Sequence, residues 1–216
     1  MTIMNSIVTH IPAGRHAACM ALFLLVSACA TTPAPKRAQS HIAIEEQVGF
    51  TITEDARVST EARSGYDEAL RFLEQGDLDR GISILESVVE SAPELVAPRV
   101  DLGIAYHLKG DLAAAEKNLL LALEANPSHP IAYNELGIVY RKLGKFAEAR
   151  RSYTAALAIY PGYHYARRNL AILCDLYLAD LDCAIDNYEA YMATVPSDDE
   201  TTMWIKDLQL RARQGN

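Results

Sequence analysis

The sequence predicts an all-α solenoid, in which helical hairpins stack one after another along the chain. The main observation is that two stretches repeat each other at an offset of 34 residues. The matched pairs are Leu102 and Leu136, Gly103 and Gly137, Tyr106 and Tyr140, Gly110 and Gly144, Ala115 and Ala149, Ala122 and Ala156, and Pro127 and Pro161. A fixed period of this length indicates small units that bury their apolar faces only against neighbouring units.

Each unit is expected to form two helices joined by a turn. Apolar residues keep helical spacing from Val100 to Leu108 and stop before Gly110, a residue that suits the left-handed conformation at helix ends. A second apolar series follows Asp111, a preferred N-cap residue, and ends before Pro127. This pattern predicts a helical hairpin.

These positions resemble the tetratricopeptide repeat (TPR), whose pattern has Leu-Gly, Tyr, Gly, Ala, an aromatic residue, Ala and Pro at fixed offsets. The fullest match is Tyr133, Leu136, Gly137, Tyr140, Gly144, Ala149, Tyr153, Ala156 and Pro161. The resemblance implies a right-handed α-solenoid over residues 58–214, with about four hairpins and a C-terminal capping helix at 198–213. The expected repeats are at about 62–95, 96–129, 130–163 and 164–198. The fourth fits only if one residue is inserted near Tyr177-Leu178-Ala179-Asp180.

The amino terminus predicts export. Residues 17–28 are apolar throughout, but they are too few to cross a hydrocarbon core of about 30 Å. They lead into Val26-Ser27-Ala28-Cys29, which resembles the bacterial lipobox. That resemblance implies a lipoprotein signal peptide at 1–28 and acyl chains, such as palmitate, on Cys29. Because Ala30 and not Asp follows, it also implies the periplasmic face of the outer membrane.

Residues 29–57 are expected to form a flexible, lipid-anchored tether, since their first part is rich in Pro, Thr and Ala. Further on, Val48, Phe50 and Ile52 alternate with small or polar residues, the period of a strand. Two interpretations stay open: the segment packs along the first repeat, or it adds a strand to the sheet of a partner. Thr53-Glu54-Asp55 then predicts the start of a helix.

Composition narrows the function. A formal net charge of −8 argues against binding to nucleic acid and against charge-driven binding to anionic lipid. The sequence contains no phosphate loop, zinc-protease motif or nucleophile elbow, and its histidines lack metal-ligand spacing. We therefore expect neither an enzyme nor a bound metal or cofactor.

Two cysteines remain after Cys29. Cys174 and Cys183 lie in one predicted hairpin, near positions where the repeat has Tyr and a small Ala. In an oxidising periplasm such a pair favours a disulfide. The alternative, two buried small hydrophobic residues, stays open.

The resemblance implies a binding groove lined by the first helix of each repeat. The groove positions are Ile104, His107, Asn134, Ile138, Arg141, Lys142, Tyr165, Arg168, Asn169 and Ile172. Among nearby residues, Arg141, Lys142, Arg167 and Arg168 suggest a positive patch suited to carboxylates.

The predicted function is a non-catalytic adaptor that docks a protein or peptide partner of an envelope complex in the periplasm. Similar lipoproteins serve pilus assembly, cell-wall hydrolase regulation, barrel assembly or TonB-type systems. One alternative is direct binding to peptidoglycan through Tyr160, Tyr163 and Tyr165. Another is self-assembly into a homo-oligomer through an apolar end of the stack, for which the degenerate first repeat is the better candidate.

Overall fold

The computed structural model describes residues 39–45, 49–55 and 58–214, and it describes side chains from residue 58 onward. The predicted signal peptide, Cys29 and the first part of the tether lie outside these ranges. Within the described part of the chain, no helix is both long enough and apolar enough to span a membrane.

A β-hairpin precedes the helices. Strand β1 (Gln39–Glu45) pairs antiparallel with strand β2 (Gly49–Asp55), in a register that sets Ile42 opposite Ile52. The predicted tether therefore contains regular secondary structure.

The hairpin differs from the sequence prediction in two ways. Strand β2 includes Phe50 and Ile52, whose alternation indicates a strand, but the partner strand belongs to the same chain and was not predicted. The helix start predicted at Thr53-Glu54-Asp55 is wrong, because β2 continues through Asp55. The first helix begins only after Ser59, whose side chain accepts a hydrogen bond from the Ala62 N–H.

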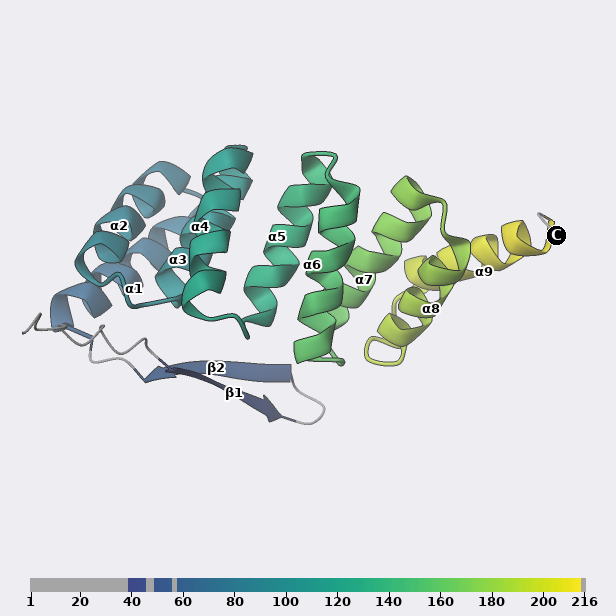
Figure 1. Cartoon of the computed structure of the whole chain (residues 1–216), viewed down its shortest axis with the longest axis horizontal. Coiled ribbons are helices and arrows are strands. Elements are labelled where there is room, and N and C mark those ends of the chain that lie inside the picture. The colour runs from purple at the N-terminus through teal and green to yellow at the C-terminus, as the bar shows by residue number, and fades with distance from the viewer. Residues whose placement is uncertain (1–38, 46–48, 56–57, 215–216) are drawn as a thin grey trace, which may run out of the picture. The chain divides into compact units, whose positions relative to one another are not determined.

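The remaining described residues form helices that follow one another in chain order (Figure 1). Each of four hairpins has a first helix with an odd number and a second helix with an even number. The helices are α1 (Thr60–Glu74), α2 (Leu78–Ser91), α3 (Ala97–Lys109), α4 (Leu112–Ala125), α5 (Pro130–Lys142), α6 (Phe146–Ile159), α7 (His164–Leu173) with the π-helical turn η1 (Cys174–Leu178), α8 (Leu181–Met192), and the final α9 (Asp199–Gln214).

The helices pack as a solenoid. Each first helix contacts the second helix of its own hairpin, and each second helix contacts the first helix that follows it. In addition α3 contacts α5, and α5 contacts α7, so these first helices are neighbours along one side. The predicted fold class, four helical hairpins and a C-terminal helix, is confirmed.

Glycine allows the two helices of a hairpin to approach closely. A Cβ atom on Gly103 would lie 2.7 Å from Cγ of Leu119, and one on Gly137 would lie 2.5 Å from Cε1 of Tyr153. Leu119 and Tyr153 are both fully buried. Any side chain at these glycines would have to displace part of a close-packed core.

The first end of the stack is polar. Ser64 and Arg71 of α1 are exposed, whereas Pro98 and Ala105, 34 residues later in α3, are buried. Helix α3 uses those positions to pack against the preceding repeat, and α1 has no preceding helix among the described residues. Apolar residues also line this end, in a pocket formed by Val58, Ala62, Tyr66, Leu95 and Pro98, and self-association through it stays a prediction.

Three of the four turns within hairpins share one geometry. Gly76, Gly110 and Gly144 have φ values of 79°, 91° and 73°. The N–H of the residue after each glycine donates to a carbonyl five residues earlier, for example from Asp111 to Tyr106 at 2.9 Å. This is the hydrogen bond of a Schellman motif.

The fourth turn contains the predicted inserted residue. Here the Asp180 N–H donates to the Cys174 carbonyl, six residues earlier, at 3.0 Å. The extra residue is accommodated in the π-helical turn η1, as single insertions into α-helices often are. Ala179 takes the place of glycine, with φ 52°.

A disulfide closes this turn. It joins Cys174, which is fully buried, to Cys183 in the first turn of α8, with 5.9 Å between the Cα atoms. The Asp180 side chain caps the same helix by accepting the Cys183 N–H at 3.1 Å. The disulfide thus fixes the inserted turn on both sides.

The left-handed Ala179 gives a test of this turn. Replacing Ala179 with Gly should raise the free energy of unfolding by about 0.5–1 kcal/mol. A non-glycine residue in this conformation costs roughly 1–2 kcal/mol, which the substitution removes, and the greater conformational entropy of glycine in the unfolded chain offsets part of this gain. The reciprocal control, Gly144→Ala, should lower it. Urea unfolding with the disulfide intact measures both. Equal midpoints for Ala179→Gly and wild type would contradict the assigned turn.

His129 gives a second test. It is 4% exposed, and its Nδ1 caps α5 by accepting the Ala132 N–H at 3.1 Å. Burial lowers the pKa of His129 to about 4. The unfolded chain therefore binds a proton at His129 more readily than the folded chain does. The contribution of the neutral His129 side chain to the free energy of unfolding is complete above about pH 6.5, and it is lost as the pH falls toward 4, by up to about 3 kcal/mol.

His129→Asn keeps an N-cap acceptor and removes the titration. Its stability should depend less steeply on pH between 6.5 and 4 than that of wild type, as measured by urea unfolding at several pH values. An unchanged slope would show that His129 is not held neutral.

Candidate functional site

The first helices place equivalent side chains side by side at intervals of 34 residues. We call the surface formed by four such rows on α3, α5 and α7 the first-helix face. Its residues are Ala97, Ile131 and Tyr165; Val100, Asn134 and Arg168; Ile104, Ile138 and Ile172; and His107, Arg141 and Asp175.

Most of the predicted groove residues are only partly accessible. Asn134 is buried, Lys142 and Tyr165 are exposed, and the other seven are half-buried. The row of isoleucines packs its inner part against the core clusters of the neighbouring hairpins. The face therefore combines a half-buried apolar row with a half-buried polar row, formed by His107, Arg141 and Asp175, on one side of it.

Neighbouring first helices are joined by polar contacts that repeat along the stack. The Tyr66 hydroxyl donates to the Asp101 carboxylate, and the Asn169 amide donates to Oδ1 of Asn134 at 2.9 Å. In both pairs the partners are 35 residues apart and belong to successive first helices. We call these contacts the inter-repeat ladder.

The middle position of the ladder is different. Val100 has no polar atom to offer Glu135, 35 residues later, and Glu135 instead accepts a hydrogen bond from the Asn134 amide at 2.9 Å. Burial raises the pKa of Glu135, while the Asn134 amide lowers it. Burial likewise raises the pKa of Asp101. Two partly desolvated carboxyl groups therefore lie in the ladder.

Three basic side chains meet at the turn end of the face. We call His107 of α3 with Arg141 and Lys142 of α5 the basic cluster. Burial lowers the pKa of His107, and the positive charges of Lys142 and Arg141 lower it further. Within residues 58–214, Nε2 of His107 and Nε of Arg141 are buried without a hydrogen-bond partner, and no salt bridge joins the cluster to a carboxylate.

Tyr177 completes this region and was not predicted. Its hydroxyl accepts a hydrogen bond from Arg141 at 3.4 Å, and the guanidinium carbon lies 5.7 Å from its ring centre. The ring also packs on Phe146, with 4.9 Å between centroids. Tyr177 belongs to the inserted turn, so the repeat pattern has no equivalent position from which to infer the contact.

The positive patch predicted from the sequence is only partly present. Arg167 does not belong to it, because its guanidinium donates to Asn187 of α8 at 3.1 Å and to the Pro161 carbonyl at 3.4 Å. Arg168 lies at the other side of the face, 5.2 Å from the Trp204 ring and 4.0 Å from Glu200 of α9. Only Arg141 and Lys142 remain, with His107 beside them.

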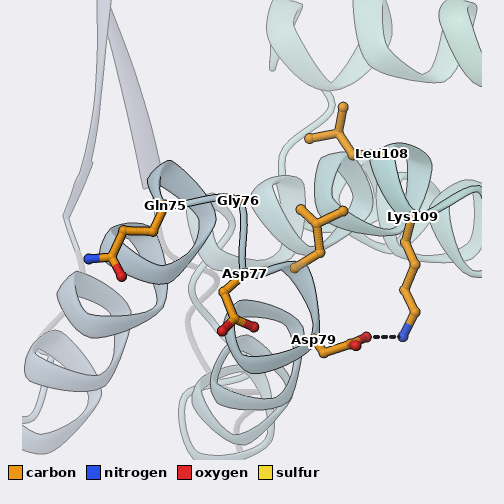
Figure 2. Close-up of a pocket in the computed structure, with 7 residues that line it drawn as sticks. Gln75, Gly76, Asp77, Asp79, Leu108 and Lys109 are labelled. Atoms are coloured by element: carbon orange, nitrogen blue, oxygen red, sulfur yellow. Dashed lines mark ion pairs between the residues drawn. The ribbon is translucent and has the colours of Figure 1, made fainter.

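An open pocket of about 620 Å³ lies away from the face (Figure 2). It is lined by the turn of the first hairpin together with Leu108 and Lys109. Lys109 pairs with Asp79 at 2.6 Å, and Asp77 pairs with Arg80. Because its charged groups are exposed and already paired, the pocket is a weaker candidate than the basic cluster.

The comparisons agree with this architecture. Residues 95–162 match the family model of the tetratricopeptide repeat. The matched segment covers α3 to α6, the two hairpins with the fullest pattern. No curated protein sequence is significantly similar to the chain.

Several solved TPR-like structures share the fold. MamA from Desulfovibrio magneticus RS-1 is 19% identical, with a TM-score of 0.65 over 73% of this chain and 88% of that one. TTC0263, a TPR protein of Thermus thermophilus, is 24% identical, with a TM-score of 0.60 over 70% and 82%. The first TPR domain of Spaghetti (RPAP3), bound to the HSP90 peptide SRMEEVD, is 24% identical, with a TM-score of 0.54 over 56% and 96%.

The basic cluster can be tested by titration. In Lys142→Glu the pKa of His107 should rise, because a nearby positive charge is replaced by a negative one. NMR titration of the His107 ring measures it, with Lys117→Glu on the exposed side of α4 as the matched control. If both variants leave the His107 pKa unchanged, the two side chains are not neighbours.

Proposed function

We propose that the protein is a non-catalytic docking scaffold that binds an acidic segment of a protein partner on the first-helix face. The observation that carries the proposal is the basic cluster. In a chain of net charge −8, it places the cationic Arg141 and Lys142 of α5 beside His107 of α3, and no salt bridge joins them to a carboxylate of residues 58–214.

The chemistry of the cluster favours a carboxylate ligand. The Lys142 ammonium is exposed, and no carboxylate of residues 58–214 pairs with it or with the Arg141 guanidinium, so a ligand carboxylate would be the first to do so. Arg141 offers a planar fork for a carboxylate, and Lys142 adds an exposed ammonium beside it. The half-buried isoleucine row next to the cluster provides apolar contact for the neighbouring residues of the same segment.

The Spaghetti domain offers a parallel for this mode of binding. The peptide bound to it, SRMEEVD, carries acidic residues toward its end. The residues that receive an acidic segment here are proposed from the present structure, since the sequence identity of 24% supports only the fold.

We propose further that the scaffold is exported and anchored in the outer membrane through acyl chains on Cys29, with the repeats in the periplasm. The Cys174–Cys183 disulfide supports an oxidising compartment. The partner would then belong to an envelope complex, such as one for pilus assembly, cell-wall hydrolase regulation, barrel assembly or TonB-type transport.

Acidic peptides test the docking face directly. A fluorescein-labelled peptide with two adjacent glutamates should bind the purified protein, and Arg141→Glu with Lys142→Glu should weaken binding by about tenfold or more, as expected for lost charge-assisted hydrogen bonds. Binding should also fall with added salt. Fluorescence anisotropy measures affinity, and the double variant Lys117→Glu with Lys206→Glu, at exposed positions outside the face, is the control for the same change in net charge. Equal losses in both variants would mean general charge attraction and no specific site.

Anchoring needs a separate experiment in cells. Cys29→Ser should abolish palmitate labelling and move the protein from the membrane fraction to the soluble fraction, because a single unlipidated tether gives no membrane affinity. Cys19→Ser, which leaves both the predicted lipobox cysteine and the Cys174–Cys183 disulfide intact, is the control for losing a cysteine. Unchanged labelling and fractionation of the Cys29→Ser protein would refute anchoring at this residue.

Direct peptidoglycan binding remains a second candidate, because one aromatic side chain projects from the face. Tyr165 is 60% exposed and packs on His164, with ring centroids 4.1 Å apart. Tyr163 is buried and Tyr160 is half-buried, so both are less available to a sugar ring. Co-sedimentation with purified sacculi, compared between wild type and Tyr165→Ser, distinguishes this function from protein docking.

A further inference from the structure

The last helix, α9, occupies the position of a fifth first helix. Thr201 and Leu208 are fully buried, and they follow the fully buried Ala166 and Leu173 of α7 by 35 residues. The offset is 34 plus the one residue inserted in the fourth turn. Helix α9 therefore continues the register of the stack.

The contacts between α7 and α9 agree with this register. Arg168 lies over the ring of Trp204, as Asn134 meets Asn169 in the previous step of the ladder. At the turn end, Arg211 of α9 pairs at 3.1 Å with Asp175, which directly follows Cys174. Helix α9 thus packs on α8 and reaches α7 and η1 through long side chains, in the register that a further first helix would have.

The two sides of α9 have different chemistry. On the side where a following second helix would pack, Lys206 stands at the position of Gly103, Gly137 and Ala171, and Gln209 at the position of Tyr106, Tyr140 and Cys174. That side closes the solenoid with polar groups. A fifth hairpin cannot form there without burying a lysine.

The other side continues the first-helix face and is apolar and acidic. Met203 and Leu210 follow the face residues Arg168 and Asp175 by 35 residues, and they are 62% and 54% exposed. Glu200 and Asp207 lie on the same stripe, with side chains 64% and 63% exposed. Arg211 pairs with both Asp175 and Asp207, and Arg168 lies 4.0 Å from Glu200, so three carboxylates stand beside two arginines at this end.

We propose that α9 extends the docking face. Met203 and Leu210 bind apolar side chains of the same partner segment, and a basic residue of that segment lies between those side chains and faces Glu200 and Asp207. This rests on the proposed function, because the acidic group of that segment lies at the basic cluster. The face is thus charged oppositely at its two ends, which selects a partner segment with the complementary order of charges.

The spacing sets the length of the segment. Two steps separate α5 from α9, and packed helices are about 8–10 Å apart, so the ends are about 16–20 Å apart. An extended chain covers this distance in about five or six residues. The partner is therefore a short peptide that carries acidic residues at one end and an apolar-basic-apolar motif about five residues away.

Designed peptides test this. The bipolar probe has Glu-Glu, four Ser or Gly residues and Leu-Lys-Leu, made in both chain directions; the acid-only probe has Ser-Ser-Ser in place of Leu-Lys-Leu. One direction of the bipolar probe should bind the purified protein about tenfold more tightly than the acid-only probe, since burying even one leucine has this effect. Met203→Ser with Leu210→Ser should remove that gain and leave acid-only binding unchanged.

The controls separate the two proposals. Leu120→Ser removes an exposed leucine on α4, outside the face, and should change neither affinity. If the acid-only probe binds but the bipolar probe gains nothing, or the gain survives in the Met203→Ser Leu210→Ser variant, the role of α9 is overturned and the basic cluster stands. If neither probe binds, the proposed function itself fails. A dimer in sedimentation velocity that dissociates in the same variant would also overturn the proposal, because α9 would then bind a second copy.

Discussion

Close approach of the two helices within each hairpin is the constraint on which the rest of the structure depends. It requires small residues at fixed positions, such as Gly103 against Leu119 and Gly137 against Tyr153. Because the same approach recurs, each hairpin presents its first helix at the same angle and distance to the next.

This regular spacing of successive first helices creates the candidate docking surface. It sets residues 35 positions apart in contact between successive first helices, as in the pairs of Tyr66 with Asp101 and Asn134 with Asn169. It also brings His107 within electrostatic range of Arg141 and Lys142 on the next helix. A basic cluster built from two repeats cannot form within one hairpin, so its integrity depends on the stacking.

The fourth turn shows how the regular spacing of the helices is kept in spite of an inserted residue. One extra residue between α7 and α8 would shift everything that follows by about a quarter of a helical turn if it propagated along a continuous helix. The π-helical turn and the Cys174–Cys183 disulfide confine it locally. The buried Thr201 and Leu208 show that the register is recovered by α9.

The helices and their register were predictable because each copy of the repeat independently indicates the same helical hairpin. The inserted residue was visible for the same reason, as a break in the offset near Tyr177. Strand β1 was not predicted from the sequence, because its pairing with β2 depends on a contact between two segments that lie outside the repeats. The role of Arg167 was misjudged because neighbours in sequence point in directions about 100° apart on a helix, so Arg167 lies with Tyr133, 34 residues earlier, away from the face.

Residues outside the repeat pattern account for the other differences at the candidate site. Tyr177 contacts Arg141 from the inserted turn, which has no counterpart in the other hairpins. Helix α9 was expected to be a C-terminal cap, and its polar side agrees with that role. That its other side continues the first-helix face follows only from the buried positions and from the Arg168–Trp204 and Asp175–Arg211 contacts.

The central claim is that the first-helix face, and not the outer surface of the second helices, is where the partner docks. A photo-reactive phenylalanine analogue placed at Ile138 of the full-length protein in living cells tests it most directly, with the same analogue at the exposed Leu120 of α4 as the comparison. The account predicts a cross-link from position 138 to an acidic segment of one protein, identified by mass spectrometry and lost when Arg141 is changed to Glu. A cross-link of equal strength from position 120, or one from position 138 that persists without Arg141, would contradict it.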